Sequence, residues 1–276
     1  MSDKAPLNQN KLGLLPGIWR LRNGSCGVGA SGESLPSLRN AALVIAAHAL
    51  RSANPYAGNS MEEHVVYLIG SEPEKGQYPS EVLLDGDPPK IRVEGPLTDE
   101  LKRAIALKHT HQYNLGYRIK GENVPKIWQW ASKRKVPDYY TPQVFPCVSS
   151  RFKDVVERFE PDVHQFFPVT VVNKAKEKIA ERWLWVVCNR IDGVDREHTT
   201  FVLKKGVQWM SSWREEGKRV RIPDAKLYHS KKQTEGYHFW RDKYLMGGGI
   251  YASDEAAEAL LALELTAFAA SKLETV

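Results

Sequence analysis

Residues 157–169, ERFEPDVHQFFPV, bring three carboxylates and an imidazole together around one proline. Carboxylate and imidazole groups within reach of each other can exchange protons in acid–base catalysis or bind a metal ion. Asp162 and His164 are two positions apart, so a strand would place them on one face and within hydrogen-bonding reach. However, no nucleophile stands nearby and no third ligand follows at a diagnostic spacing. We therefore expect Glu157, Asp162 and His164 to be structural.

The apolar residues around this stretch predict the elements that hold it. From Phe152 to Phe159 they recur at offsets of three, four and seven, which is the stripe of a helix packed on a core. Pro161 must end this helix, because the residue before a proline avoids the helical conformation. From Val163 onward apolar side chains alternate, which predicts a strand with Val163 and His164 on opposite faces. The polar cluster is thus predicted at a helix-to-strand corner.

The second group of chemically capable residues is the basic, aromatic segment 204–243. It holds eleven Lys or Arg against five Asp or Glu, an excess equal to the net charge of +6 of the whole chain. Cations interleaved with aromatic rings are typical of surfaces that bind single-stranded nucleic acid. The same pattern arises when the rings face the core and the cations face either solvent alone or an acidic protein partner. Trp209 and Trp213 are predicted to share the inner face of one strand.

Other motifs lack the context that their chemistry needs. Residues 27–32, GVGASG, fit the dinucleotide-binding pattern, but no strand precedes them and no acid follows at the required distance. His109 and His111 would share a strand face, yet no third ligand follows at a suitable spacing. Three cysteines, far apart and odd in number, argue against disulfides and structural zinc. We therefore expect no cofactor, no metal ion and no enzymatic activity.

A repeated order of signals predicts an α+β fold. A strand, a Ser or Thr helix cap, a helix and another strand recur near residues 91–113, 144–169 and 250–268. Residues 183–188 are apolar on both faces, as in a central strand, and 199–213 predict a hairpin. We expect a mixed or largely antiparallel sheet, single across the C-terminal half, with helices packed on one side.

Composition also suggests how the chain is divided and where it resides. We expect an N-terminal α+β region over residues 1–136, with an irregular lead-in and a helix over 36–50, followed by a second α+β domain over 137–276. The longest apolar run, 41–47, is shorter than the roughly 18 residues that a membrane-spanning helix needs. No signal peptide is visible at the N-terminus. These features predict a cytoplasmic protein with no membrane partner, and they do not indicate an oligomeric state.

The C-terminal half resembles a known family. The runs that carry the resemblance are PDYY at 137–140, CVSS at 147–150, RFKDVVER at 151–158, PDVHQFFP at 161–168, GIYASDE at 249–255 and LTAF at 265–268. They are similar to motifs of the immunity-protein-eleven family, first catalogued as a domain of unknown function and encoded in bacterial polymorphic-toxin loci. The resemblance covers residues 137–276. It implies a cytoplasmic protein, associated with type VI secretion, that binds and silences a cognate toxin and has no catalytic residues.

We therefore predict an immunity protein that neutralises a toxin by forming a stoichiometric complex. The alternative is a nucleic-acid-binding protein that uses residues 204–243. The residues expected to contact the partner are Arg214, Lys218, Arg219, Arg221, Lys231, Lys232 and Arg241, with the stretch 128–135, which includes Trp128 and Trp130, as a second choice. Arg219 and Arg221 are predicted to share one face of a strand.

Overall fold

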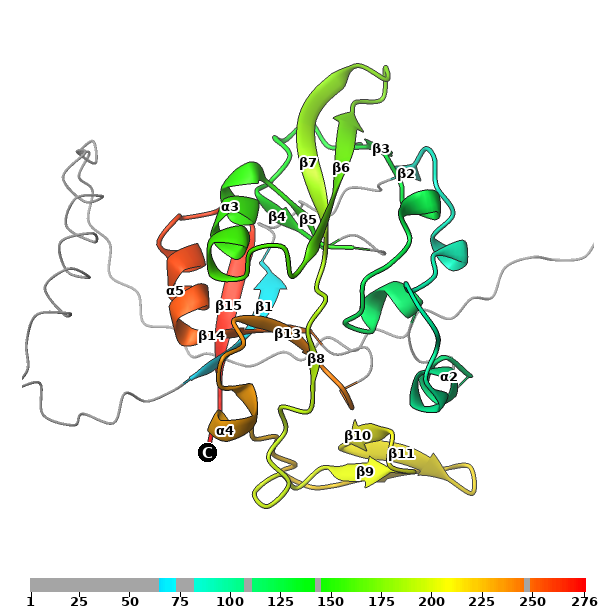
Figure 1. Cartoon of the computed structure of the whole chain (residues 1–276), viewed down its shortest axis with the longest axis vertical. Helices are drawn as coiled ribbons and strands as arrows, with labels where there is room; N and C mark the ends of the chain where they lie inside the picture. Colours follow the sequence, from blue (N-terminus) through cyan, green and yellow to red (C-terminus); the bar gives the residue numbers. More distant parts are fainter. Residues whose placement is uncertain (1–64, 73–81, 107–110, 142–144, 246–248) are drawn as a thin grey trace, which may run out of the picture. The chain divides into compact units, whose positions relative to one another are not determined.

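The computed structural model describes residues 65–72, 82–106, 111–141, 145–245 and 249–276 (Figure 1). All of them belong to one compact unit that spans Met61–Val276. The lead-in, the expected helix over 36–50 and the glycine motif at 27–32 lie outside the described residues. Within these residues, four α-helices accompany two large sheets and two hairpins, which confirms the α+β class.

The larger sheet has six strands, and all neighbours except β3 and β6 run antiparallel. Its strands, in spatial order, are β2 (Val82–Leu83), β3 (Ile127–Gln129), β6 (Gln165–Val172), β7 (Lys178–Val186), β5 (Cys147–Val148) and β4 (Tyr139–Tyr140). Strand β7 lies between β6 and β5, so the prediction of a central strand at 183–188 is confirmed.

The second sheet has five strands and joins distant parts of the chain. In spatial order they are β15 (Phe268–Leu273), β1 (Val66–Ser71), β14 (Ile250–Ser253), β13 (Phe239–Asp242) and β8 (Arg190–Ile191). Strand β1 lies between β14 and β15, where Val66 is paired with Ser253 on one side and with Leu273 on the other. The C-terminal half therefore contributes to two sheets and not to the single sheet that we expected. The chain leaves the six-stranded sheet at Val186, the end of β7. It then joins the five-stranded sheet at β8, which pairs with β13.

The helices begin largely where their caps predict. They are α2 (Asp99–Ala106), α3 (Ser150–Phe159), α4 (Lys231–Thr234) and α5 (Asp254–Leu261), together with the short turns η1 (Pro88–Lys90), η2 (Gln112–Asn114) and η3 (Gly121–Asn123). The Thr98 hydroxyl accepts the Leu101 N–H at 3.2 Å, and the Ser253 hydroxyl accepts the Ala256 N–H at 3.3 Å. Ser149 precedes α3, but its side chain makes no capping bond. Helices α3 and α5 lie side by side and share a core with strands of both sheets (Figure 1).

Two of the three repeated units have the predicted form, namely β5–α3–β6 and β14–α5–β15. The first unit differs because no strand leads into α2. Val93 makes only a single bridge with Ile119. Gly95, with φ of +74°, and Pro96 turn the chain immediately afterwards, so an extended segment cannot continue. Downstream, the residues after the undescribed 107–110 form the turn η2.

The expected domain boundary at 136/137 falls inside the six-stranded sheet. Strands β2 and β3 come from before this point, and β6 and β7 come from after it. Ile127 is paired with Thr170 across the expected boundary. Residues on the two sides of the expected boundary therefore contribute strands to one sheet.

The segment expected as one hairpin over 199–213 forms parts of two. One joins β9 (Val202–Lys204) to β10 (Gln208–Met210), and the other joins β11 (Ser212–Glu215) to β12 (Lys218–Arg221). The strand breaks at Ser211, whose carbonyl accepts the Ile222 N–H at 2.8 Å. Trp209 and Trp213 therefore lie in different hairpins, and the prediction that they share one strand face is wrong.

Buried His229 makes stability depend on pH. Burial lowers the pKa of His229 from its ordinary 6.5 to about 4, so below pH 6.5 the unfolded chain binds the proton more readily and stability falls. Burial raises the pKa of Asp242 from 3.8 to about 6, which opposes this loss as the pH falls through that range. Between about pH 7 and pH 5 we expect the wild type to lose about 2 kcal/mol relative to His229→Phe. Urea unfolding at both pH values measures the difference, and equal pH dependence would contradict it.

Candidate interaction surface

The β11–β12 hairpin gathers three arginines on one face. Residues directly opposite in an antiparallel ladder share a face, and Arg214 stands opposite Arg219 while Ser212 stands opposite Arg221. Arg219 and Arg221 also share a face because they are two positions apart in one strand. We call Arg214, Arg219 and Arg221 the arginine face. The structure confirms that Arg219 and Arg221 lie together and adds Arg214 to them.

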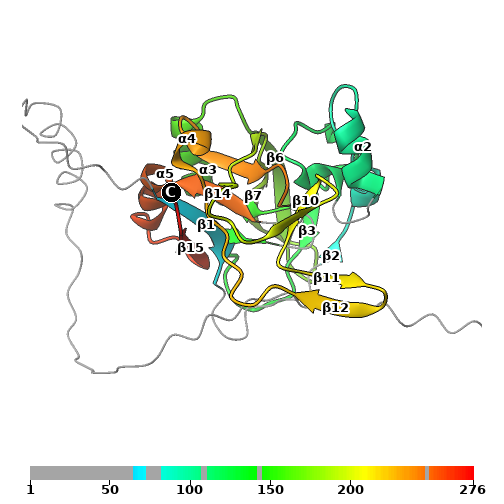
Figure 2. The same cartoon turned by 90° about the horizontal axis from the view of Figure 1, so that it is seen from below.

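The arginine face is exposed and carries uncompensated charge. All three side chains are exposed, and none forms an ion pair or hydrogen bond with another described residue. On the other face of the hairpin, Trp213 and Val220 are partly buried, and the Lys204 ammonium lies 3.8 Å from the Trp213 ring. Figure 2 shows the hairpin, in yellow, projecting beyond the strands of the larger sheets. Arg214 and Arg219 stand directly opposite each other, and like charges in this position destabilise a strand pair. The arginine face therefore lowers the stability of the hairpin.

The remaining cations of the basic segment do not form one surface with the arginine face. Lys218 stands opposite Glu215 and so points to the side of Trp213. Lys231 and Lys232 belong to α4, which lies apart from the hairpin (Figures 1 and 2). The structure therefore divides the segment into separate basic regions.

Arg241 and the two tryptophans of the second choice are not surface residues. Arg241 is partly buried in β13, bonds to the Asn114 side chain at 3.3 Å, and has its pKa lowered to about 10 by burial. Trp128 and Trp130 are each 1% exposed; in the core, Trp128 stacks with Tyr140 and Trp130 meets the Tyr140 ring edge-on. A partner therefore cannot reach these two rings in the folded protein, whereas Lys133, Arg134 and Lys135 of the same stretch are exposed.

The aromatic rings of the basic segment are mostly covered. Trp209 and Trp240 are buried, and Trp213 is partly buried beneath Lys204. In the described part of this segment, the large aromatic side chain with an exposed surface is Tyr237, at 38%. Stacking of successive bases needs exposed rings next to cations. The arrangement favours the interpretation in which rings fill the core and cations face outward.

The polar corner at 157–169 is built around Glu160, a residue that our sequence analysis did not single out. Its buried carboxylate accepts the His164 Nε2–H at 2.6 Å, the Asn189 amide at 2.9 Å and the backbone N–H groups of His238 and Phe239 at 2.9 and 3.1 Å. No local spacing could have revealed this role, because α3 ends at Phe159 and three of the four partners of the carboxylate lie beyond residue 188. Asp162, which a strand would have placed within reach of His164, is not its partner, and Glu160 takes that place.

The hydrogen bonds around His164 define its protonation. Its Nδ1 accepts the Cys188 N–H at 3.1 Å, so the proton lies on Nε2 and is donated to Glu160. Glu157 instead pairs with Lys153 on the surface of α3, and the Asp162 carbonyl accepts from Arg118. The side chains of His164 and Glu160 thus connect the corner between α3 and β6 to two other segments. These are the residues after β7, at Cys188 and Asn189, and the start of β13 with the residue before it, at Phe239 and His238.

Replacing His164 with alanine should therefore lower the free energy of unfolding without changing the surface. The carboxylate of Glu160 would lose one bond and the Cys188 N–H would lose its acceptor, so we expect a loss of about 1 to 3 kcal/mol. Urea unfolding measures it, and partner binding by the folded variant should equal that of the wild type. A variant with unchanged stability but no binding would make the corner a functional site.

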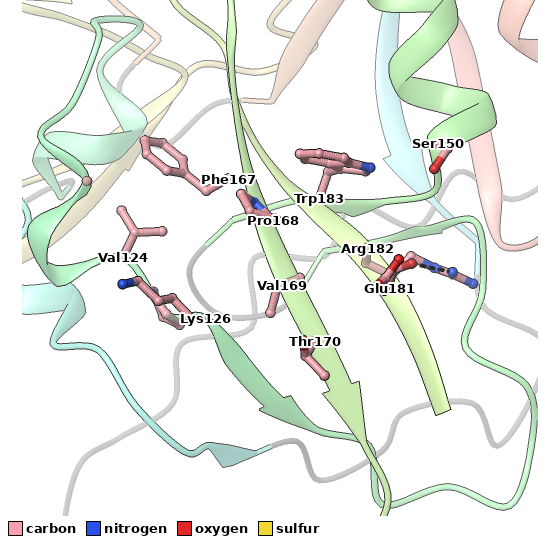
Figure 3. A pocket seen from close by; sticks show the side chains of 12 residues that line it. Val124, Lys126, Ser150, Phe167, Pro168, Val169, Thr170, Glu181, Arg182 and Trp183 are labelled. Carbon is pink, nitrogen blue, oxygen red and sulfur yellow. Dashed lines mark hydrogen bonds between the residues drawn. The ribbon is translucent and has the colours of Figure 1, made fainter. Parts of the chain in front are cut away.

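A pocket of about 420 Å³ lies over the β6–β7 strands, and the sequence analysis missed it (Figure 3). Its lining includes Val124, Lys126, Phe167, Pro168, Thr170 and Trp183. These residues come from three separate segments, so no local motif could have revealed the pocket.

Among the described residues, no three His, Cys, Asp or Glu side chains are grouped to hold a metal ion. None of the described helices is long and apolar enough to cross a membrane.

Comparison with known proteins places the chain in a family. The model of the immunity protein family Imm11 matches residues 71–275. No curated protein matches the chain. The family match includes the runs at 137–168 and 249–268 that carry the resemblance, and it begins well before them. The chain therefore belongs to the immunity protein family Imm11.

Proposed function

We propose that this immunity protein neutralises a cognate toxin by forming a stoichiometric complex in which the arginine face makes the first contact. The observation that supports the proposal is the placement of Arg214, Arg219 and Arg221 on one exposed face without acidic partners among the described residues. Guanidinium groups pair with carboxylates through two parallel hydrogen bonds. The matching surface of the toxin would therefore carry clustered Asp or Glu residues.

The proposed inhibition is steric and needs no chemistry from the immunity protein. A stable complex of this kind buries about 1,600 Å² in total, and charge complementarity mainly raises the rate of association. Acidic residues gather at the active sites of metal-dependent enzymes, so a toxin of this kind would offer the arginine face a suitable target. We further propose that the protein acts as a binder and not as an enzyme. It would act in the bacterial cytoplasm, within a polymorphic-toxin system linked to type VI secretion.

Growth protection tests the proposal directly. The toxin encoded by the neighbouring reading frame should arrest growth when expressed alone, and co-expression of the full chain should restore it. The purified proteins should form a complex of fixed stoichiometry, measured by calorimetry and light scattering. Protection without a detectable complex would contradict the proposal.

A parallel titration addresses the nucleic-acid alternative. The full chain is mixed with single-stranded oligonucleotides over a range of salt concentrations. Tight binding with a steep fall of affinity in salt would favour the alternative, because bound cations displace counterions from phosphates. We expect weak binding, since most rings of the basic segment are covered.

A further inference from the structure

The pocket over β6 and β7 exists because a hydrogen-bonded ladder stops there. The Thr170 N–H donates to the Lys126 carbonyl at 2.8 Å, on the edge of β6 that faces β3. Two positions earlier on the same edge stands Pro168, which has no N–H, so the ladder cannot continue. The facing segment also contains a proline, Pro125, which lines the pocket. A hollow therefore remains where further pairing would have closed the sheet.

Two rings line this hollow from opposite faces of the β6–β7 ladder, because Trp183 stands opposite Pro168 in the register whereas Phe167 stands opposite Leu184. Figure 3 shows Phe167 on one side and Trp183 on the other, with Pro168 between them. Gly121 allows the position of Phe167, because a Cβ there would lie 2.9 Å from the ring. The Lys153 ammonium lies 5.0 Å from the centroid of the Trp183 ring. A volume of about 420 Å³ suits a single small ligand, since ligand pockets range upward from about 300 Å³.

The charged groups at the rim differ in the hydrogen bonds and ion pairs that they already form. The Arg182 guanidinium donates to three backbone carbonyls, those of Val136, Pro137 and Glu181. The Glu181 carboxylate forms an ion pair with Lys178. Lys126 is exposed and has no ion pair or side-chain hydrogen bond with another described residue. The uncompensated charge at the rim is therefore positive and lies on the Lys126 side.

We propose that this pocket binds an aromatic ring that carries a carboxylate. The ring would pack against Trp183 and Pro168, which share one face of the ladder, and the carboxylate would contact Lys126, away from Glu181. Such a group occurs in free aromatic acids and in the C-terminal aromatic residue of a peptide. This site goes beyond the proposed function, because it belongs to the six-stranded sheet and includes no residue of the arginine face.

Two matched probes test the site on the full chain. N-acetyl-tryptophan has the ring and the carboxylate, whereas N-acetyl-tryptophanamide has the ring alone. Ligand-observed NMR should give about two- to fivefold tighter binding of the acid, a ratio typical of one exposed ion pair. Lys126→Gln should reduce the affinity for the acid to that for the amide. Lys174→Gln, which removes an exposed cation from the turn between β6 and β7, is the control and should change neither affinity.

A filled pocket provides the second test. Thr170→Trp should place a ring in the hollow and abolish binding of both probes while the thermal unfolding of the protein stays cooperative. A short peptide ending in tryptophan, compared with the free acid, identifies the source of the ligand. Failure of the acid to bind the wild type, or equal binding to wild type and Thr170→Trp, would overturn the proposal. Toxin neutralisation by Thr170→Trp is measured separately, so loss of the pocket and loss of the proposed function remain distinguishable.

Discussion

Replacing Glu160 with alanine is expected to lower the free energy of unfolding by about 3 to 5 kcal/mol, the loss typical of breaking a buried charged network. The buried carboxylate accepts four hydrogen bonds, two from the side chains of His164 and Asn189 and two from the backbone of β13 and the residue before it. Alanine would leave these donors buried without an acceptor, and each unsatisfied group costs free energy. Urea unfolding followed by circular dichroism measures the change.

Glu157 on the same helix supplies the matched control. Its carboxylate is partly exposed and pairs with Lys153 alone, so Glu157→Ala should cost less than about 1 kcal/mol. A loss below that level for Glu160→Ala as well would mean that water replaces the missing acceptor. The corner would then be less important for the fold than its hydrogen bonds indicate.

Reversing the charge of Arg219 and Arg221 together should slow association with the toxin at least about tenfold at low salt, because steering by a charged face raises association rates by such factors. The dissociation rate should change less. Added salt should shrink the difference, since it screens exposed charges over about 10 Å at 0.1 M. Stopped-flow fluorescence over a range of salt concentrations measures both rates.

The same change of charge at a different place provides the control. Lys231 and Lys232 are also cations of the basic segment, but they lie on α4, apart from the hairpin. Reversal of both should slow association less than reversal of Arg219 and Arg221. If both double reversals slow association equally, the net charge and not the arginine face causes the effect. An association rate that does not depend on salt would exclude electrostatic steering.

Local patterns predicted the corner at 157–169 well but did not predict its central residue. The stripe from Phe152 and the position of Pro161 correctly gave the end of α3, but β6 begins at Gln165 and not at Val163, because residues 161–163 form a turn with Asp162 at φ of +61°. Glu160 was missed because two of its partners, Asn189 and His238, are far away in the sequence and reach it only through tertiary folding. Periodicity describes one element at a time, and a buried carboxylate is held by several.

The interaction surface was predicted in part for the same reason. Alternation along one strand placed Arg219 and Arg221 together, and strand pairing added Arg214. The tryptophans were harder, because alternation along a strand does not say which face of the sheet packs on the core. Trp128 lies in β3, and the pairing of β3 with β6 joins segments on both sides of the expected domain boundary.

The position of β1 has a consequence for when the protein becomes able to protect a cell. Val66 finds its neighbours only in Ser253 and Leu273, so the five-stranded sheet cannot close until the ribosome has made β15. Contacts so distant in sequence form late and slowly. During synthesis, a nascent chain would hold β1 without partners, exposed to proteases and to aggregation. The supply of active inhibitor would then lag behind translation, and a cell would need a standing reserve of finished protein before its toxin appears.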